Sequence, residues 1–211
     1  MRVVLALLLL AGAAAWALHA WTEKSIRTQT QYDSLIQPVA VKLNLDPLLV
    51  RAIIWRESRF QPLVRGLNKE KGLMQVTPGV AAEWAERHHV EPIDPDALFD
   101  PETNIEIGSW YFARMLSHWS ETDNPAGFAL AEYNAGRSNA LRWVDPEQPA
   151  SFAAFSSRIA FGSTKRYVFA ILQKHADYQR GYFRPPWLAW WDRVTRRADA
   201  PTLVGPAANA N

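Results

Sequence analysis

Glu57, in the stretch WRESRFQP (residues 55–62), is the side chain with the clearest potential for chemistry. On a wheel of 3.6 residues per turn, Val50, Ile53 and Ile54 lie on the same helix face as Glu57. The carboxyl group therefore ends an apolar stripe. Because burial penalises the charged form, we expect its pKa to rise toward neutrality, where it could donate a proton. This is the environment of a general acid.

A simpler interpretation of Glu57 stays open from this stripe alone. A glutamate at a helix end can lean into solvent and pair with a nearby cation, here Arg56 or Arg59. The stripe is predicted to be helical because Asp46 is a good N-cap and Pro47 suits the first turn. A helix that is apolar nearly all round belongs in a core. Other parts of the sequence have to distinguish the two interpretations.

Helical spacing and capping residues dominate the chain, and we expect a mostly α fold. The sequence contains no run with the alternation of a strand and no internal repeat. Residues 61–79 are rich in turn formers and predict a loop, while residues 145–157 predict a loop or a short helix. Besides residues 46–57, helices are predicted over residues 35–43, 77–88, 105–116, 124–136 and 164–178.

Composition favours one main domain and argues against several classes of function. A chain of 211 residues that is 48% hydrophobic can fill one sizeable core. Its 23 basic and 21 acidic residues nearly balance, so nucleic-acid binding is not predicted. With no Cys and five His outside any ligand spacing, we expect no metal and no cofactor. The 10 Trp residues suit either a groove that stacks sugars or a core.

Residues 1–21 have the pattern of a signal peptide or an N-terminal membrane anchor. Arg2 precedes an uncharged apolar run over residues 3–18. The tripeptide AWA at residues 15–17 offers a cleavage site, yet the run is also nearly long enough to span a bilayer uncleaved. In both cases the chain is predicted to leave the cytoplasm.

Residues 181–211 differ in composition and predict a Trp- and Arg-rich C-terminal tail that is partly disordered. Pro185 and Pro186 interrupt the chain before the Trp-rich part. Residues 188–197 could form a short amphipathic helix for an anionic surface, or their Trp side chains could pack on the domain. The domain between the two ends is predicted to cover residues 22–180.

Four short motifs occur together in this sequence: ESRF at residues 57–60, GLMQ at 72–75, AEYNAG at 131–136 and TKRYV at 164–168. In this combination and order they resemble the catalytic domain of the soluble lytic transglycosylase (SLT) family, which cleaves peptidoglycan. The glutamine of GLMQ follows Glu57 by 18 positions, as in the family. The resemblance covers about residues 32–178, and Asn104 and Gly108 are among its lesser matches.

The chain departs from the family pattern at two places. Gly66 stands where the family often has Ser, and Asn68-Lys69-Glu70-Lys71 replaces the usual small residues before GLMQ. A hydroxyl near the catalytic acid is therefore missing, with Asn68 as a polar substitute. The family's Glu-Thr before the last helix is Ser163-Thr164 here. These changes bear on substrate positioning more than on the type of reaction.

The resemblance implies a lysozyme-like transglycosylase fold with a single catalytic domain. It implies a peptidoglycan lytic transglycosylase that cleaves the β-1,4 bond between N-acetylmuramic acid and N-acetylglucosamine. Glu57 would act first as acid and then as base, although glycosidases usually need two carboxylates. The muramyl N-acetyl group would replace the second carboxylate. The sugar's own 6-hydroxyl would then close a 1,6-anhydro ring.

The resemblance also assigns roles to residues around Glu57. Tyr167 would orient the glutamate or the N-acetyl group, and Gln75 and Asn134 would form hydrogen bonds with the glycan. Met74 and Tyr133 would offer apolar faces to sugar rings, or would simply belong to the core.

Two alternatives of other kinds stay open. A hydrolytic muramidase would need a second carboxylate, for which Glu70, Asp94, Asp96 and Glu132 are candidates. The other alternative is a non-catalytic peptidoglycan-binding protein of an envelope-spanning assembly. The intact Glu57 argues against it. The expected location is the periplasm or cell envelope of a bacterium. The expected partners are peptidoglycan glycan strands, a membrane reached through the N-terminus or the tail, and an envelope protein complex.

Overall fold

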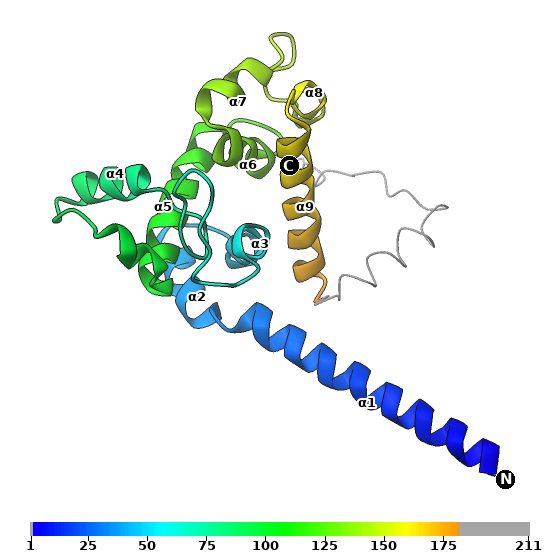
Figure 1. The fold of residues 1–211 in the computed structure, drawn as a ribbon. Coiled ribbons are helices and arrows are strands. Elements are labelled where there is room, and N and C mark those ends of the chain that lie inside the picture. The colour runs from blue at the N-terminus through cyan, green and yellow to red at the C-terminus, as the bar shows by residue number, and fades with distance from the viewer. Residues whose placement is uncertain (1, 182–211) are drawn as a thin grey trace, which may run out of the picture. The chain divides into compact units, whose positions relative to one another are not determined.

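The computed structural model describes residues 2–181 (Figure 1). Within this range the chain forms helices joined by loops, with two isolated β-bridges and no strand. The mostly α prediction is confirmed. The predicted Trp- and Arg-rich tail lies outside the described residues, apart from Gly181.

The described residues divide between two units, residues 2–25 in one and residues 26–181 in the other. Helix α1 (Arg2–Thr30) contributes its apolar part to the first unit, where residues 3–18 are exposed. Among the described residues, the segment Val3–Lys42 is long and apolar enough to cross a membrane by length and composition, a test that a signal sequence also passes. The helix continues through residues 22–30, for which the sequence indicated only polarity.

The second unit contains the predicted helices and two short ones, η1 and α7, that the sequence analysis did not predict. They are α2 (Asp33–Lys42), α3 (Pro47–Ser58), α4 (Pro78–His88), the 3-10 helix η1 (Pro95–Phe99), α5 (Pro101–His118), α6 (Pro125–Ala135), α7 (Arg137–Trp143), α8 (Phe152–Arg158) and α9 (Gly162–Gln179). Residues 145–157, predicted as a loop or a short helix, supply a loop and most of α8.

A repeated pair of residues starts the four helices α3, α4, α5 and α6. Asp46, Thr77, Asp100 and Asn124 each cap a helix with a side-chain oxygen that accepts a hydrogen bond from a backbone N–H of the first turn. Each is followed by a proline, whose fixed φ suits the first helical position. At the other end of α6, Gly136 has φ +82° and ends the helix, as predicted.

The core lies where α3, α5, α6 and α9 meet. α6 contacts both α5 and α9, and α3 contacts α9 (Figure 1). Ile53 of α3, Phe112 of α5, Phe128 of α6 and Ile171 of α9 are all fully buried. Because these helices come from distant parts of the sequence, their packing brings side chains far apart in the chain to one place.

The loop between α3 and α4 is fixed to α5 by the amide of Asn104. Its Oδ1 accepts a hydrogen bond from the Met74 N–H (2.7 Å), and its Nδ2 donates to the carbonyls of Lys71 (2.8 Å) and Leu98 (2.7 Å). Gly72 has φ +76°, and a Cβ there would lie 2.4 Å from Asn104 Nδ2. The loop can therefore approach α5 this closely only with glycine at residue 72.

Replacing Asn104 by alanine is expected to destabilise the domain by about 2–3 kcal/mol, because the Met74 N–H and the Leu98 carbonyl lose this partner. The Lys71 carbonyl keeps its hydrogen bond from the Val76 N–H. The free energy of unfolding in urea, followed by circular dichroism, measures the loss. Gln173→Ala, which removes an exposed amide of α9, is the matched control and should change stability by less than about 0.5 kcal/mol. Equal losses in the two variants would show that Asn104 does not anchor the loop.

Candidate active site

Glu57 lies in the last turn of α3, at the end of the predicted apolar stripe. Val50, Ile53 and Ile54 on the same face are buried, with exposed fractions of 1%, 0% and 0%. The Glu57 side chain itself is partly exposed. The helix therefore holds the carboxyl group at the boundary between the core and an open space, as the stripe predicted.

A phenol contacts the carboxyl group directly. Tyr167 of α9 donates a hydrogen bond from its Oη to Glu57 Oε1, at 2.6 Å. The Tyr167 ring is 2% exposed, and the guanidinium of Arg56 lies 5.3 Å from its centroid. Burial raises the pKa of Tyr167 well above its usual value, so the phenol keeps its proton and remains a donor.

Burial raises the pKa of Glu57 from 4.5 to about 7. The hydrogen bond from Tyr167 and the charge of Arg56 act in the opposite direction, and the charge of Glu70 adds to the increase. Within the described residues Glu57 has no ion pair, since Arg56 lies over Tyr167 and Arg59 lies 3.9 Å from the ring centroid of Trp55. At neutral pH a large fraction of Glu57 is therefore protonated, which is the condition for a general acid.

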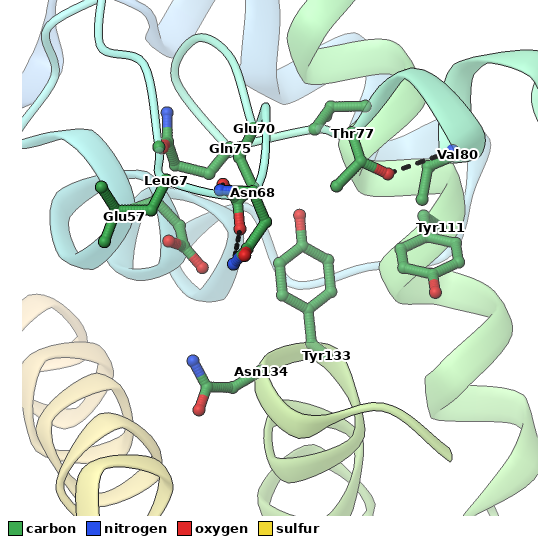
Figure 2. A pocket seen from close by; sticks show the side chains of 12 residues that line it. Glu57, Leu67, Asn68, Glu70, Gln75, Thr77, Val80, Tyr111, Tyr133 and Asn134 are labelled. Carbon is green, nitrogen blue, oxygen red and sulfur yellow. Dashed lines mark hydrogen bonds between the residues drawn. The ribbon is translucent and has the colours of Figure 1, made fainter. Parts of the chain in front are cut away.

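The Glu57 side chain lines a cavity of about 390 Å³ (Figure 2). Its walls come from the end of α3, the loop that follows it, the start of α4, and helices α5 and α6. The lining residues are Glu57, Gly66, Leu67, Asn68, Glu70, Gln75, Val76, Thr77, Val80, Tyr111, Tyr133 and Asn134. The mix of carboxyl, amide, hydroxyl and aromatic groups suits a ligand with both polar edges and apolar faces.

Three of the residues that the sequence singled out line the cavity together with Glu57. Gln75 has φ +51°, and its Nε2 donates to the carbonyls of Gly72 (2.9 Å) and Val64 (3.2 Å). Tyr133 donates from Oη to the Met74 carbonyl at 2.8 Å. Asn134 is exposed and accepts a hydrogen bond from the hydroxyl of Thr164 at 2.8 Å.

Met74 and Tyr167 are placed differently from these three and do not line the cavity. The Met74 side chain is fully buried, beside Gly108 and with its sulfur 3.7 Å from the hydroxyl of Ser109. It supports the cavity wall from behind, through the backbone carbonyl that Tyr133 contacts. Tyr167 reaches the cavity only through its hydrogen bond to Glu57.

The sequence did not single out Leu67, Val80 or Tyr111 as site residues. Tyr111 of α5 lies with its ring centroid 5.8 Å from that of Tyr133, and both side chains face the cavity (Figure 2). An aromatic residue at this position on α5 looks like any core residue in the sequence. Only the packing of α5 beside α6 reveals its place.

The four candidates for a second carboxylate differ in their surroundings. Glu132 is 2% exposed and is held by Trp119 Nε1 at 2.6 Å, with His118 and Arg137 nearby. Asp94 caps η1, and Asp96 pairs with Lys71 at 2.8 Å. Glu70 alone of the four lines the cavity. Residues 2–181 contain no group of three His, Asp or Glu side chains placed to hold a metal ion.

Comparison with known proteins places this chain among transglycosylases of one family. The family model of the transglycosylase SLT domain matches residues 34–155. The soluble lytic murein transglycosylase of Escherichia coli K12 is 29% identical over 161 residues, covering 75% of this chain and 24% of that protein. The membrane-bound lytic murein transglycosylase C of Shigella sonnei is 26% identical over 168 residues, covering 71% of this chain and 47% of that protein.

A solved structure is similar as well. An inactive variant of the lytic transglycosylase Slt from Pseudomonas aeruginosa, with one glutamate changed to glutamine, has a TM-score of 0.67 and 25% sequence identity. The match covers 74% of this chain and 25% of that protein, so the chain spans about a quarter of the length of this relative and of the Escherichia coli one. The predicted transglycosylase fold is confirmed. Since the family model covers more than half of the chain, the protein belongs to the transglycosylase SLT domain family.

Proposed function

We propose that the protein is a peptidoglycan lytic transglycosylase with Glu57 as its single general acid and base. The observation that carries the proposal is a carboxyl group with a pKa of about 7 at an accessible cavity, in a chain of this family. The inactive glutamate-to-glutamine variant of the Pseudomonas aeruginosa relative is in line with an essential glutamate. The substrate would be the β-1,4 bond between N-acetylmuramic acid and N-acetylglucosamine.

In the proposed reaction the proton moves out of Glu57 and returns to it. Protonated Glu57 donates to the glycosidic oxygen as the bond from C1 of the muramyl sugar breaks. The carbonyl oxygen of the muramyl N-acetyl group stabilises C1, where glycosidases usually employ a second carboxylate. The Glu57 carboxylate then takes the proton of the 6-hydroxyl, whose oxygen bonds to C1. No water is consumed.

The neighbours of Glu57 can assist both halves of this cycle. The Tyr167 hydroxyl donates to Glu57 Oε1, so it would stabilise the carboxylate formed after the first proton transfer. Gln75 and Asn134 would form hydrogen bonds with the glycan, and the ring of Tyr133 would contact a sugar face. Met74 would act indirectly, because its backbone carbonyl accepts the hydrogen bond that fixes the Tyr133 hydroxyl.

Hydrolysis is the second candidate reaction, and the presence of Glu70 at the cavity favours it. A muramidase would employ this carboxylate to activate a water or to bind C1. Both oxygens of Glu70 already accept hydrogen bonds from Asn68, which weakens its suitability as a base. A purely binding protein would not need a carboxyl group whose proton is held near neutral pH.

Mass spectrometry of the fragments released from purified peptidoglycan tests the proposal. The full chain in detergent is expected to release 1,6-anhydromuramyl products, and Glu57→Gln is expected to lower the rate about 10²- to 10⁴-fold. Glu86→Gln, which neutralises an exposed acid of α4, is the matched control and should behave as the parent. Reducing-end muramyl products would establish hydrolysis, and no product from the parent would favour a binding role.

The pH dependence of kcat/KM tests the acid role. Because Glu57 must be protonated and its pKa is about 7, activity is expected to fall above about pH 7. Tyr167→Phe removes a donor that lowers the pKa of Glu57, so this alkaline limb should move to higher pH while kcat falls. Tyr178→Phe removes another buried hydroxyl of α9, bonded to Gln29, and should leave the limb in place. An unmoved limb in Tyr167→Phe would contradict the assignment.

We further propose that residues 1–21 direct the chain to the periplasm as a signal peptide or membrane anchor, ahead of a catalytic domain that ends near residue 180. The exposed apolar part of α1 supports this, and the Shigella sonnei relative is named as membrane-bound. Contact with the membrane through the tail, and membership of an envelope protein complex, stay predictions.

Deleting residues 3–18 is expected to leave the protein in the cytoplasm, because the remaining chain lacks an apolar run for export. Protease accessibility in spheroplasts measures the location, and the mass of the mature chain distinguishes a cleaved signal from an anchor. A double Val3→Leu and Val4→Leu variant keeps the run apolar and should be exported normally. Export of the deletion variant would refute the role of this segment.

A further inference from the structure

Glu70 extends from the loop after α3 to the same cavity as Glu57. Figure 2 shows both side chains there, with Asn68 hydrogen-bonded to Glu70. The reaction proposed above needs one carboxyl group, so the second has no assigned task. Two other loop residues, Asn68 and Gly66, bear on its position.

Asn68 fixes the carboxylate of Glu70 at both oxygens. The Asn68 backbone N–H donates to Oε2 at 2.8 Å, and Asn68 Nδ2 donates to Oε1 at 3.0 Å. Burial acts to raise the pKa of Glu70, but the hydrogen bonds from Asn68 outweigh it and the pKa is lowered. Glu70 is therefore an anion at neutral pH.

Gly66 provides the space that the carboxylate occupies. A Cβ on residue 66 would lie 2.3 Å from Glu70 Oε2 and 2.8 Å from Gln75 Oε1, closer than side chains approach one another. The backbone of Gly66 is not left-handed, so the absence of a side chain, and not an unusual φ, is what matters here. A side chain at residue 66 would therefore require the carboxylate of Glu70 to move from its present position.

The negative charge of Glu70 acts on Glu57 across the cavity. It adds to the increase in the pKa of Glu57, which burial dominates. The other groups that face Glu57 are the phenols of Tyr167 on α9 and Tyr133 on α6, both neutral because burial raises their pKa values, and the cation Arg56 on α3 itself. The charge of Arg56 favours the ionised form of Glu57, and the charge of Glu70 favours the protonated form.

We propose that Glu70 is a positioning residue of this site, a fixed anion in the space left by Gly66 that disfavours a second negative charge at Glu57 and accepts a hydrogen bond from the sugar. The proposal rests on the proposed function. A carboxylate offers about four acceptor positions, of which Asn68 occupies two. The rest can accept from a sugar hydroxyl or an N-acetyl N–H. An anion beside Glu57 makes it easier to protonate and, once ionised, a stronger base for the 6-hydroxyl.

Glu70→Gln tests the charge with little change of shape. Its alkaline limb of kcat/KM is expected to move to lower pH by a few tenths of a unit, opposite to Tyr167→Phe, and its KM to rise about threefold to tenfold. Gly66→Ala places a methyl group against the Glu70 carboxylate and should shift the limb in the same direction. Glu86→Gln is the control for loss of a distant surface charge.

Combining the two changes separates the proposed role from a merely structural one. If Gly66→Ala acts by displacing Glu70, it should add no further shift of the limb to Glu70→Gln. Thermal unfolding of each variant confirms that it is folded. An alkaline limb of Glu70→Gln that coincides with that of the parent would overturn the proposal. The proposal would also be overturned if the parent released reducing-end products and Glu70→Gln released anhydro products, because Glu70 would then be a hydrolytic base. An inactive parent would instead count against the proposed function.

Discussion

The proposed reaction requires a Glu57 carboxyl group that is buried enough to hold a proton at neutral pH and accessible enough to reach a sugar. Three core residues of α3 bury the carboxyl group on one side, and the phenol of Tyr167 on α9 contacts it on another. The cavity supplies the access. Because α3 and α9 lie more than a hundred positions apart in the sequence, this contact exists only if the α3, α6 and α9 core is packed correctly. The chemistry of the site and the stability of the fold therefore depend on the same helices.

The loop after α3 meets a second requirement, since it has to carry polar groups to the cavity without moving. Asn104 satisfies three backbone groups of the surrounding segments, and the side chain of Gln75 satisfies two more. Tyr133 fixes the Met74 carbonyl from α6. These buried and partly buried hydrogen bonds replace the regular pairing that a strand would provide. A loop anchored in this way can hold a charged side chain such as Glu70 at a defined place.

Local signals in the sequence predicted much of this structure. The capping residues with their prolines located the starts of α3, α4 and α6, while α5 begins at Pro101, four residues before its predicted start. The stripe ending in Glu57 predicted both its burial and its raised pKa. The motifs identified the family. What local signals did not reveal are contacts between distant segments, such as Asn104 with the loop, Tyr111 at the cavity wall and the burial of Met74. Each depends on how helices pack, which spacing along one helix does not encode.

The burial of Glu57 also has a consequence for the stability of the folded chain. In an unfolded chain this glutamate would ionise near pH 4.5, whereas in the folded protein it does so near pH 7. Between these values the folded state binds more protons than the unfolded state, so stability falls as pH rises through this window and levels off above it. The shift corresponds to a loss on the order of 3 kcal/mol at alkaline pH, a substantial fraction of the stability of a small domain. The contribution of Glu57 to stability is therefore greatest where this acid is protonated, so the rise in pH that would remove its proton for the proposed reaction also removes that contribution.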